Sequence, residues 1–155
     1  QGIIRVPFIW ADPKDKSPGT VSTELACSQD IPNSILARAG LASCAGMQGK
    51  DLTKMLFGGE FTPHDGILIQ QQTTIPLPGD TQHMRVKTFV DKEWRISYYS
   101  GKDWGELYNI KEDPDEIYNL WASSEHKTIR LELMTRMFES MVEGESMSPL
   151  QINVG

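Results

Sequence analysis

Two cysteines and three histidines are the first side chains in this 155-residue chain that could do chemistry. Two cysteines are too few for a disulfide framework, and free, partly buried thiols are favoured over a Cys27–Cys44 pair. His64, His83 and His126 follow neither HxxH nor HExxH spacing. Metal sites on one helix need such spacing, so the pattern favours surface histidines over a metal site.

An acidic cluster in the sequence DPDE is the next candidate, because carboxylates bind calcium. A calcium loop needs alternating oxygen ligands and a glycine at its sharp turn, which Pro114 and Ile117 do not supply. Asp113, Asp115 and Glu116 are therefore interpreted as residues of a turn that can also start a helix.

The composition limits the classes of function. A net charge of -6 argues against nucleic acid as a partner, since phosphate backbones select for clustered lysine and arginine. No apolar run approaches the roughly 20 residues that cross a bilayer, which argues against a membrane-spanning segment. The length is that of one ordinary domain with its own core.

The first 60 residues read as elements of an α/β domain. Ile3–Trp10 is almost continuously apolar, which is typical of a strand buried on both faces in a parallel sheet. A helix is predicted from about Ile31 to Gly40, with Asp30 or Ser28 near its N-cap. Gln48–Gly59 is predicted to form a second short helix.

From Gly66 onward the pattern changes to alternation of apolar and polar residues. Four antiparallel strands are predicted, around Ile67–Ile69, Met84–Val90, Trp94–Tyr98 and Leu107–Ile110. Residues 119–121 should return as an apolar plug onto the sheet after the turn at Pro114. An amphipathic helix over residues 123–143 is predicted to cover one face of the sheet. Its predicted inward stripe consists of Ile129, Leu133, Met134, Met137, Phe138 and Met141.

Four motifs in this order resemble the C-terminal part of a type I sulfatase, a formylglycine-dependent enzyme of the alkaline-phosphatase-like superfamily. They are a Gly-Gly-x-Arg-Val-Pro strand, an Asp-x-x-Pro-Thr…Ala-Gly helix, a Gly-x-Ser/Asp-Leu turn and a Leu-Tyr-Asp-Leu-x-x-Asp-Pro-x-Glu-x-x-Asn-Leu end. The matching residues are Gly2, Arg5, Val6 and Pro7; Asp30, Pro32, Ala39 and Gly40; Gly49, Asp51 and Leu52; and Leu107, Tyr108, Asp113, Pro114, Glu116, Asn119 and Leu120. Two departures are Gln1 or Ile3 where a glycine is usual and Asn33 in place of threonine.

The resemblance implies an α+β fold. A four-stranded antiparallel sheet with a packed C-terminal helix is expected, preceded by a strand and helices from the end of an α/β alkaline-phosphatase-like domain. Residues 1–62 would be the tail of that domain and residues 63–155 the C-terminal subdomain.

The resemblance also implies a parent enzyme that hydrolyses sulfate esters of a small molecule or glycan, using formylglycine and calcium or magnesium. Formylglycine is made from the first residue of a CxPxR motif, and neither Cys27 nor Cys44 lies in one. The chain alone is therefore expected to be an inactive fragment, with no cofactor of its own and with a missing N-terminal catalytic domain as its partner. A periplasmic or secreted location is slightly favoured by the resemblance.

The basic segment HMRVKT is the place where the family's C-terminal subdomain approaches the mouth of the active site. His83, Arg85 and Lys87 are accordingly candidate substrate-rim residues, with a solvated strand face as the alternative interpretation. Several aromatic residues could stack on a sugar, although cross-strand packing explains most of them without a ligand. These residues are Trp94, Tyr98, Tyr99, Trp104 and Tyr108.

Two other functions stay open at this point. The parent could cleave phosphate or phosphonate esters, because related folds share the metal cage. The chain could also be a stand-alone carbohydrate-binding or interaction module. If the chain is a fragment of a hydrolase, the apolar segment Ile3–Trp10 and the helices after it would leave apolar surface uncovered without the rest of the domain. Self-association through the first 60 residues is therefore expected.

Overall fold

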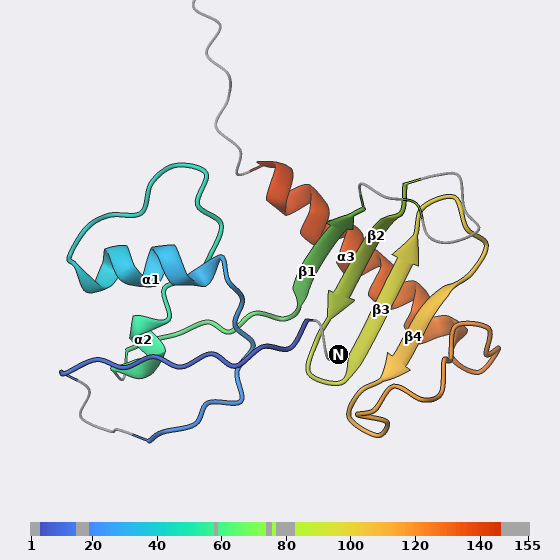
Figure 1. Ribbon diagram of the computed structural model, residues 1–155, viewed down its shortest axis with the longest axis horizontal. Helices are drawn as coiled ribbons and strands as arrows, with labels where there is room; N and C mark the ends of the chain where they lie inside the picture. The colour runs from blue at the N-terminus through green and yellow to red at the C-terminus, as the bar shows by residue number, and fades with distance from the viewer. Residues whose placement is uncertain (1–3, 15–18, 58, 74–75, 77–82, 147–155) are drawn as a thin grey trace, which may run out of the picture. The chain divides into compact units, whose positions relative to one another are not determined.

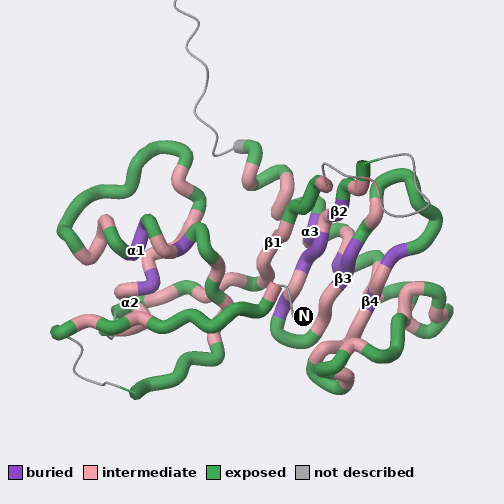
Figure 2. Tube along the Cα trace, in the orientation of Figure 1, coloured by how far each residue is buried: buried purple, intermediate pink, exposed green. Residues whose placement is uncertain are grey.

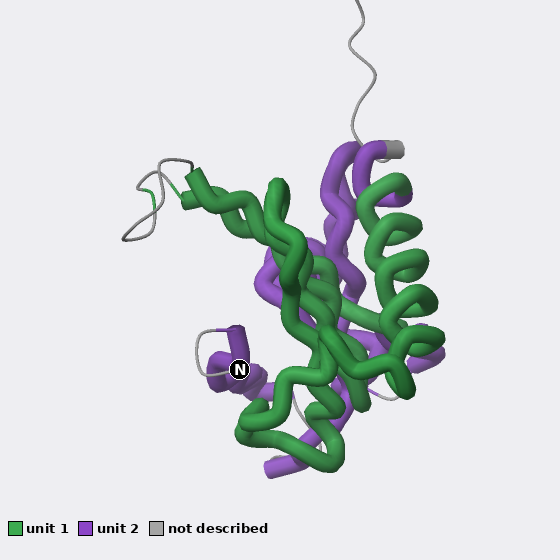
Figure 3. The backbone as a smooth tube through the Cα atoms, turned by 90° about the vertical axis from the view of Figure 1, so that its right-hand side faces the viewer, with its two compact units in different colours: residues 1, 65–142 green, residues 2–64, 143–155 purple. Residues whose placement is uncertain are grey.

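The computed structural model describes residues 4–14, 19–57, 59–73, 76 and 83–146. Two units make up the chain, and each is considered by itself (Figure 3). We call residues 65–142 the sheet unit, and residues 2–64 together with 143–155 the loop unit. Within the described residues, no helix is both long enough and apolar enough to cross a membrane.

The sheet unit is a four-stranded antiparallel meander, as predicted (Figure 1). Its elements are β1 (Ile67–Gln72), β2 (Arg85–Val90), β3 (Trp94–Tyr99), β4 (Gly105–Asn109) and most of α3 (Lys127–Ser146). Phe89 pairs with Ile96, and Ile96 pairs in turn with Leu107. Directly opposed residues lie on the same face of a sheet, so the register places these three apolar side chains in one row.

This row meets α3 to form the core. Phe89, Ile96 and Leu107 are buried together with Leu133 and Met137 of the helix, and Figure 2 shows the buried positions on the sheet and helix. Ile129, Met134, Leu120, Trp121, Trp94 and Leu68 pack around them. The predicted helix is therefore confirmed, and four of the six residues predicted to face inward lie in the core or pack against it.

Phe138 was predicted to point inward, and this prediction is wrong: its side chain is 63% exposed. It follows Met137 directly, so it lies about 100° further around the helix and outside the buried stripe.

The segment after β4 forms the predicted turn but starts no helix, since α3 begins only at Lys127. The Asp113 carboxylate accepts the backbone N–H groups of Ile117 at 3.1 Å and Tyr118 at 2.9 Å. Glu116 takes a left-handed backbone conformation, with φ of 56°, and binds the Arg95 guanidinium. These acidic residues are thus occupied in holding the turn.

Asn119 returns the chain to the sheet. Its side-chain oxygen accepts the N–H of Leu107 at 3.1 Å, and its side-chain nitrogen donates to the carbonyl of Gly105 at 3.0 Å. The N–H of Leu120 then donates to the carbonyl of Leu107 at 2.8 Å. Asn119 therefore hydrogen-bonds the edge of β4 as a neighbouring strand would, which seats the apolar plug of Leu120 and Trp121 against the core.

The loop unit contains α1 (Asp30–Arg38) and α2 (Thr53–Leu56). The first helix agrees with its prediction, although its N-cap is Gln29, without a side-chain bond, rather than Asp30 or Ser28. The second helix is much shorter than predicted. Within the described residues 4–14 no strand forms where Ile3–Trp10 was expected to be one. A strand needs a hydrogen-bonded neighbour, and the described part of the loop unit contains no sheet.

Candidate functional site

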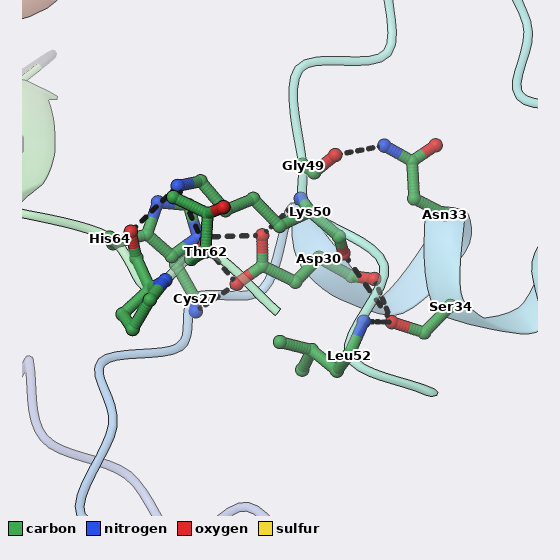
Figure 4. Close-up of polar contacts among 10 residues, drawn as sticks. Cys27, Asp30, Asn33, Ser34, Gly49, Lys50, Leu52, Thr62 and His64 are labelled. Atoms are coloured by element: carbon green, nitrogen blue, oxygen red, sulfur yellow. Dashed lines mark hydrogen bonds and ion pairs between the residues drawn. The ribbon is translucent and has the colours of Figure 1, made fainter. Parts of the chain in front are cut away.

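The most organised polar cluster of the loop unit surrounds the carboxylate of Asp30, the first residue of α1. Asp30 is fully buried. One carboxylate oxygen accepts the N–H of Cys27 at 2.8 Å, and the other accepts the N–H of Lys50 at 2.7 Å. His64 Nε2 lies 3.0 and 3.1 Å from the same two oxygens, as Figure 4 shows. The carboxylate thus joins three segments that are distant in sequence.

Two further side chains of α1 fasten the segment that contains Lys50. Ser34 Oγ donates to the carbonyl of Asp30 at 2.7 Å and accepts the N–H of Leu52 at 2.9 Å. The amide of Asn33 donates to the carbonyl of Gly49 (Figure 4). The sequence GKDL is therefore wrapped against the start of α1 by side-chain to backbone hydrogen bonds.

Gly49 is required by this close approach. A Cβ added to it would lie 1.9 Å from the carbonyl oxygen of Gln29, which belongs to the chain just before α1. No side chain can be accommodated there without moving one backbone away from the other.

The charges in this cluster depend on the hydrogen bonds. Burial opposes ionisation of Asp30, but bonds from His64 and from two backbone N–H groups outweigh it and hold the pKa of that carboxyl below its usual value. Burial, followed by the negative charge of Asp30, raises the pKa of the Cys27 thiol. The ammonium of Lys50 points elsewhere and donates to the carbonyls of Thr62 at 3.0 Å and Pro63 at 2.8 Å.

Cys27, Asp30 and His64 together bring a sulfur, a carboxylate oxygen and a ring nitrogen within 4.8 Å of one another. The prediction that His64 is a surface residue is therefore wrong: its side chain is only 14% exposed. Both cysteines are free thiols, as predicted; Cys27 is partly buried as expected, whereas Cys44 is exposed and that part of the prediction is wrong. Only the Cys27–x–x–Asp30 spacing hints at the cluster, because His64 lies 34 residues beyond Asp30 and no local motif includes it.

The structure places the three predicted substrate-rim residues on and beside β2. Arg85 is exposed at the start of the strand, Lys87 is half-buried two positions later, and His83 is exposed just before the strand. Arg85 and Lys87 lie on the same side of β2, because alternate residues share a face. The ammonium of Lys87 donates to the side chain of Gln70 on β1.

The aromatic residues do not form one platform. Trp94 and Tyr98 are on one face of β3, whereas Tyr99 is on the other, and Tyr108 pairs opposite Arg95 on that second face. Most of them have packing partners within the sheet unit. Tyr99 lies against Trp104 with ring centroids 4.4 Å apart, and Arg95 covers the Tyr108 ring at 4.8 Å. Packing therefore accounts for these residues better than a sugar site does.

Comparison with protein families decides the relationship of the chain. Residues 1–143 match the family described as N-sulphoglucosamine sulphohydrolase, C-terminal. The chain belongs to this family. The match includes all four motifs of the sulfatase resemblance and extends through both units. A search of curated proteins found no match.

Solved structures share the fold of this family member at low sequence identity. A structure described as a 2-O GAG sulfatase is 19% identical, with a TM-score of 0.67, and the match covers 75% of this chain and 24% of that one. A structure from work on glycosaminoglycan metabolism by Bacteroides thetaiotaomicron is 19% identical, with a TM-score of 0.68 and coverage of 85% and 30%. A third, solved in complex with D-glucosamine-2-N,6-O-disulfate, is 19% identical, with a TM-score of 0.63 and coverage of 80% and 25%. The chain thus spans only about a quarter to a third of the length of these proteins.

Proposed function

We propose that this chain serves as the C-terminal part of a sulfatase that hydrolyses sulfate esters or sulfamates of sugars. The observation that carries the proposal is the family match over residues 1–143. Two of the structurally similar proteins are described by a glycosaminoglycan sulfatase activity and by a complex with a sulfated glucosamine. A sulfated amino sugar, free or within a glycan, is therefore the substrate class that we propose for the complete protein.

The residues that the structure describes do not fit the formylglycine or the calcium or magnesium ion that the family implies. Calcium and magnesium prefer oxygen ligands, whereas the cluster of Cys27, Asp30 and His64 offers a sulfur and a nitrogen beside one carboxylate. Cys27 is followed by Ser28 and Gln29, so it lacks the CxPxR context, and its thiol is half-buried beside a carboxylate. Cys44 is followed by Ala45 and Gly46 and lacks it as well. We therefore assign both groups to an upstream catalytic region, and we expect this chain alone to release no sulfate.

The role proposed for the sheet unit is to provide part of the rim around the substrate. Arg85 is exposed and lies on the same side of β2 as Lys87, and His83 lies two residues before the strand begins. Two cations on one side of a strand attract a sulfated, and therefore anionic, substrate. If they bind substrate without taking part in the reaction, Arg85→Ala and Lys87→Ala should raise KM and leave kcat nearly unchanged. Lys127→Ala, which removes an exposed cation from α3, is the matched control.

The activity test uses the complete polypeptide that contains this chain. Glucosamine carrying N-sulfate and glucosamine carrying 6-O-sulfate are supplied as separate substrates, and released sulfate is measured by ion chromatography. Release from at least one of these substrates supports the proposal. Faster cleavage of matched phosphate or phosphonate esters would instead favour the related phosphohydrolase class, and binding of glycans without any turnover would favour a binding module.

We also propose that the catalytic region covers apolar side chains of the loop unit. Val6, Ile9 and Val21 are 70%, 86% and 88% exposed, and Ile35 and Leu41 are more than half exposed. Such surface usually finds a partner, so the isolated chain should self-associate. Light scattering across protein concentrations tests this expectation, and a monomer at every concentration with no binding of a hydrophobic dye would contradict it.

A further inference from the structure

We propose that Cys27, Asp30 and His64 form a binding site for a divalent cation of the zinc class. A thiol sulfur, a carboxylate oxygen and an imidazole nitrogen converge there within 4.8 Å. They come from the segment before α1, from the first residue of α1 and from a segment 34 residues further along the chain. All three residues belong to the loop unit, so the site depends on that unit alone.

The donor set selects the kind of metal. Calcium and magnesium prefer shells made only of oxygen atoms, whereas thiolate and imidazole together favour zinc, cobalt and related transition metals. This site is therefore different in kind from the calcium or magnesium site that the family implies, and it is unrelated to sulfate hydrolysis. The inference consequently does not rest on the function proposed above.

The distances are close to those of a coordination sphere. In tetrahedral zinc sites, bond lengths of about 2.0–2.3 Å place neighbouring ligand atoms about 3.3–3.7 Å apart. His64 Nε2 lies 3.0 and 3.1 Å from the two Asp30 oxygens, and no pair among the three ligand atoms is further apart than 4.8 Å. Side-chain rotations of Cys27 and His64 can supply the remaining adjustment, and zinc sites with three protein ligands take a water molecule as the fourth.

Groups outside the site hold the Asp30 carboxylate in a fixed orientation. The backbone N–H groups of Cys27 and Lys50 each donate to one of its oxygens, at 2.8 and 2.7 Å. Backbone donors of this kind orient a ligating carboxylate in metal sites. The same two bonds remain possible with a metal present, because a carboxylate oxygen can accept a hydrogen bond and bind a cation together.

Charge supports the same conclusion. Asp30 is fully buried, and among the described residues the basic side chain within reach of its carboxylate is that of His64 rather than a lysine or arginine. Lys50, the nearest lysine in the cluster, uses its ammonium on two backbone carbonyls instead. A buried carboxylate is stabilised by a paired charge or a metal ion, and a doubly charged cation would balance this carboxylate together with a thiolate of Cys27. The half-buried positions of Cys27 and His64 leave a path from solvent.

The competing explanation is a hydrogen bond between Asp30 and His64 with Cys27 as a small packed thiol. It accounts for the pair but gives the sulfur no part in the site. Cobalt separates the two explanations, because a Co²⁺ ion bound by a thiolate gives a sulfur-to-metal charge-transfer band in the near ultraviolet. Without a metal site no such band arises.

The experiment titrates the chain, purified without a histidine tag and treated with a chelator, with Co²⁺ alone under reducing conditions. The wild-type chain should give one equivalent of the charge-transfer band, and Zn²⁺ should displace it. Cys27→Ser should abolish the band, and His64→Gln should weaken Co²⁺ binding at least tenfold. Cys44→Ser and His83→Gln, which change an exposed thiol and an exposed imidazole, should leave the charge-transfer band and the Co²⁺ affinity unchanged.

Zn²⁺ should also raise the melting temperature of the wild-type chain and of Cys44→Ser, but not that of Cys27→Ser, since only the folded site binds the ion. The proposal is overturned if the wild-type chain gives no band, or if the band persists in Cys27→Ser. Unchanged Co²⁺ affinity in His64→Gln would show that His64 is not a metal ligand, and this result would also overturn the proposed site. Circular dichroism of each variant establishes that the comparison is made between folded chains.

Discussion

The two units of this chain are held together by different forces. The sheet unit has a cluster of five buried apolar residues, to which β2, β3, β4 and α3 all contribute. In the described part of the loop unit, the buried residues are Asp30, Asn33, Ser34 and Leu52, and three of these four are polar. One unit is thus organised by burial of apolar surface and the other by hydrogen bonds from side chains to backbone.

The contrast shows how differently a fold can be specified. Apolar burial is non-directional and tolerates repacking, whereas a buried hydrogen-bond network requires each partner at its position. The sheet unit does bury Thr88 and Ser97, but these hydroxyls pair with each other at 2.9 Å and lie on the face opposite the apolar row. The loop unit buries few apolar residues and exposes several. It is therefore stabilised mainly by the hydrogen bonds that its buried polar side chains make to the backbone, which we call its polar joints.

The largest expected effect is that of Gly49→Ala in the loop unit. The added methyl group would meet the carbonyl of Gln29, a backbone atom that cannot rotate away, so we expect a loss of more than about 3 kcal/mol. Hydrogen exchange measured by mass spectrometry should show loss of protection over α1, with the strands still protected. Gly59→Ala is the control, because its Cβ would meet Lys54 at an ordinary 3.5 Å. Equal effects of the two substitutions would show that the joint at Gly49 is not tight.

The next effect concerns the core of the sheet unit. Leu107→Ala removes a fully buried side chain from the centre of the apolar row and should lower the free energy of unfolding by about 2–5 kcal/mol. The loss should appear as protection lost across all four strands. Leu131→Ala on the exposed side of α3 should change stability by less than about 0.5 kcal/mol. A small effect at Leu107 would contradict the role given to the apolar row.

A smaller effect is expected from Ser34→Ala in the loop unit. The change leaves the N–H of Leu52 without its acceptor in a buried position, which should cost about 1–3 kcal/mol. Urea denaturation of the variant measures the loss, with the exposed Ser28→Ala as control. If Ser34→Ala were as stable as the wild type, the loop unit would have to be held by something other than its polar joints.

The sheet unit could be predicted from the sequence because its elements carry their own signals. Period-2 alternation marked the four strands, and the 3.6-residue stripe marked the helix. Asn119 and Leu120 were expected to return to the sheet, and they do so by bonding β4. The sequence pattern did not predict that Phe138 is exposed. Met137 and Phe138 are adjacent apolar residues at the edge of the stripe, and the pattern alone does not show which of them points inward.

The loop unit was harder to predict because its order depends on long-range contacts. Ile3–Trp10 has the composition of a strand, but a strand is defined by its neighbour, and none is present in the described part of this unit. The cluster of Cys27, Asp30 and His64 joins residues up to 37 positions apart. Periodic patterns in a sequence predict local elements and give no information about such long-range contacts. The glycine of GKDL was matched as a motif, yet its reason, the approach to Gln29, is visible only in three dimensions.

The pH dependence of the loop unit should show itself at the acid end. Hydrogen bonds from the Arg38 guanidinium, followed by one from the N–H of Lys14, lower the pKa of Asp12 to about 2 from 3.8. A carboxyl with a lowered folded pKa stabilises the fold above its unfolded pKa, and this contribution is lost as the pH falls from about 4 to about 2. Asp12→Asn should therefore unfold with less pH dependence than the wild type across this window. Identical acid unfolding curves would exclude a contribution from the Asp12–Arg38 pair.

The smallest expected effect lies at the alkaline end and belongs to the sheet unit. Burial, followed by the neighbouring charge of Glu106, raises the pKa of Tyr99 to about 12 from 10.0. The folded state therefore favours the neutral phenol, while the unfolded chain releases its proton near pH 10. The stabilisation is fully present below pH 10 and is lost as the pH rises towards about 12. Tyr99→Phe cannot ionise, so its melting temperature should fall less steeply than that of the wild type between pH 10 and 12. The ring still packs on Trp104 in the variant, which isolates the hydroxyl as the cause. If the melting temperatures of the variant and the wild type fell equally between pH 10 and 12, the loss of stability would have to arise from other groups. The acid response of the loop unit through Asp12 would then have no alkaline counterpart in the sheet unit through Tyr99.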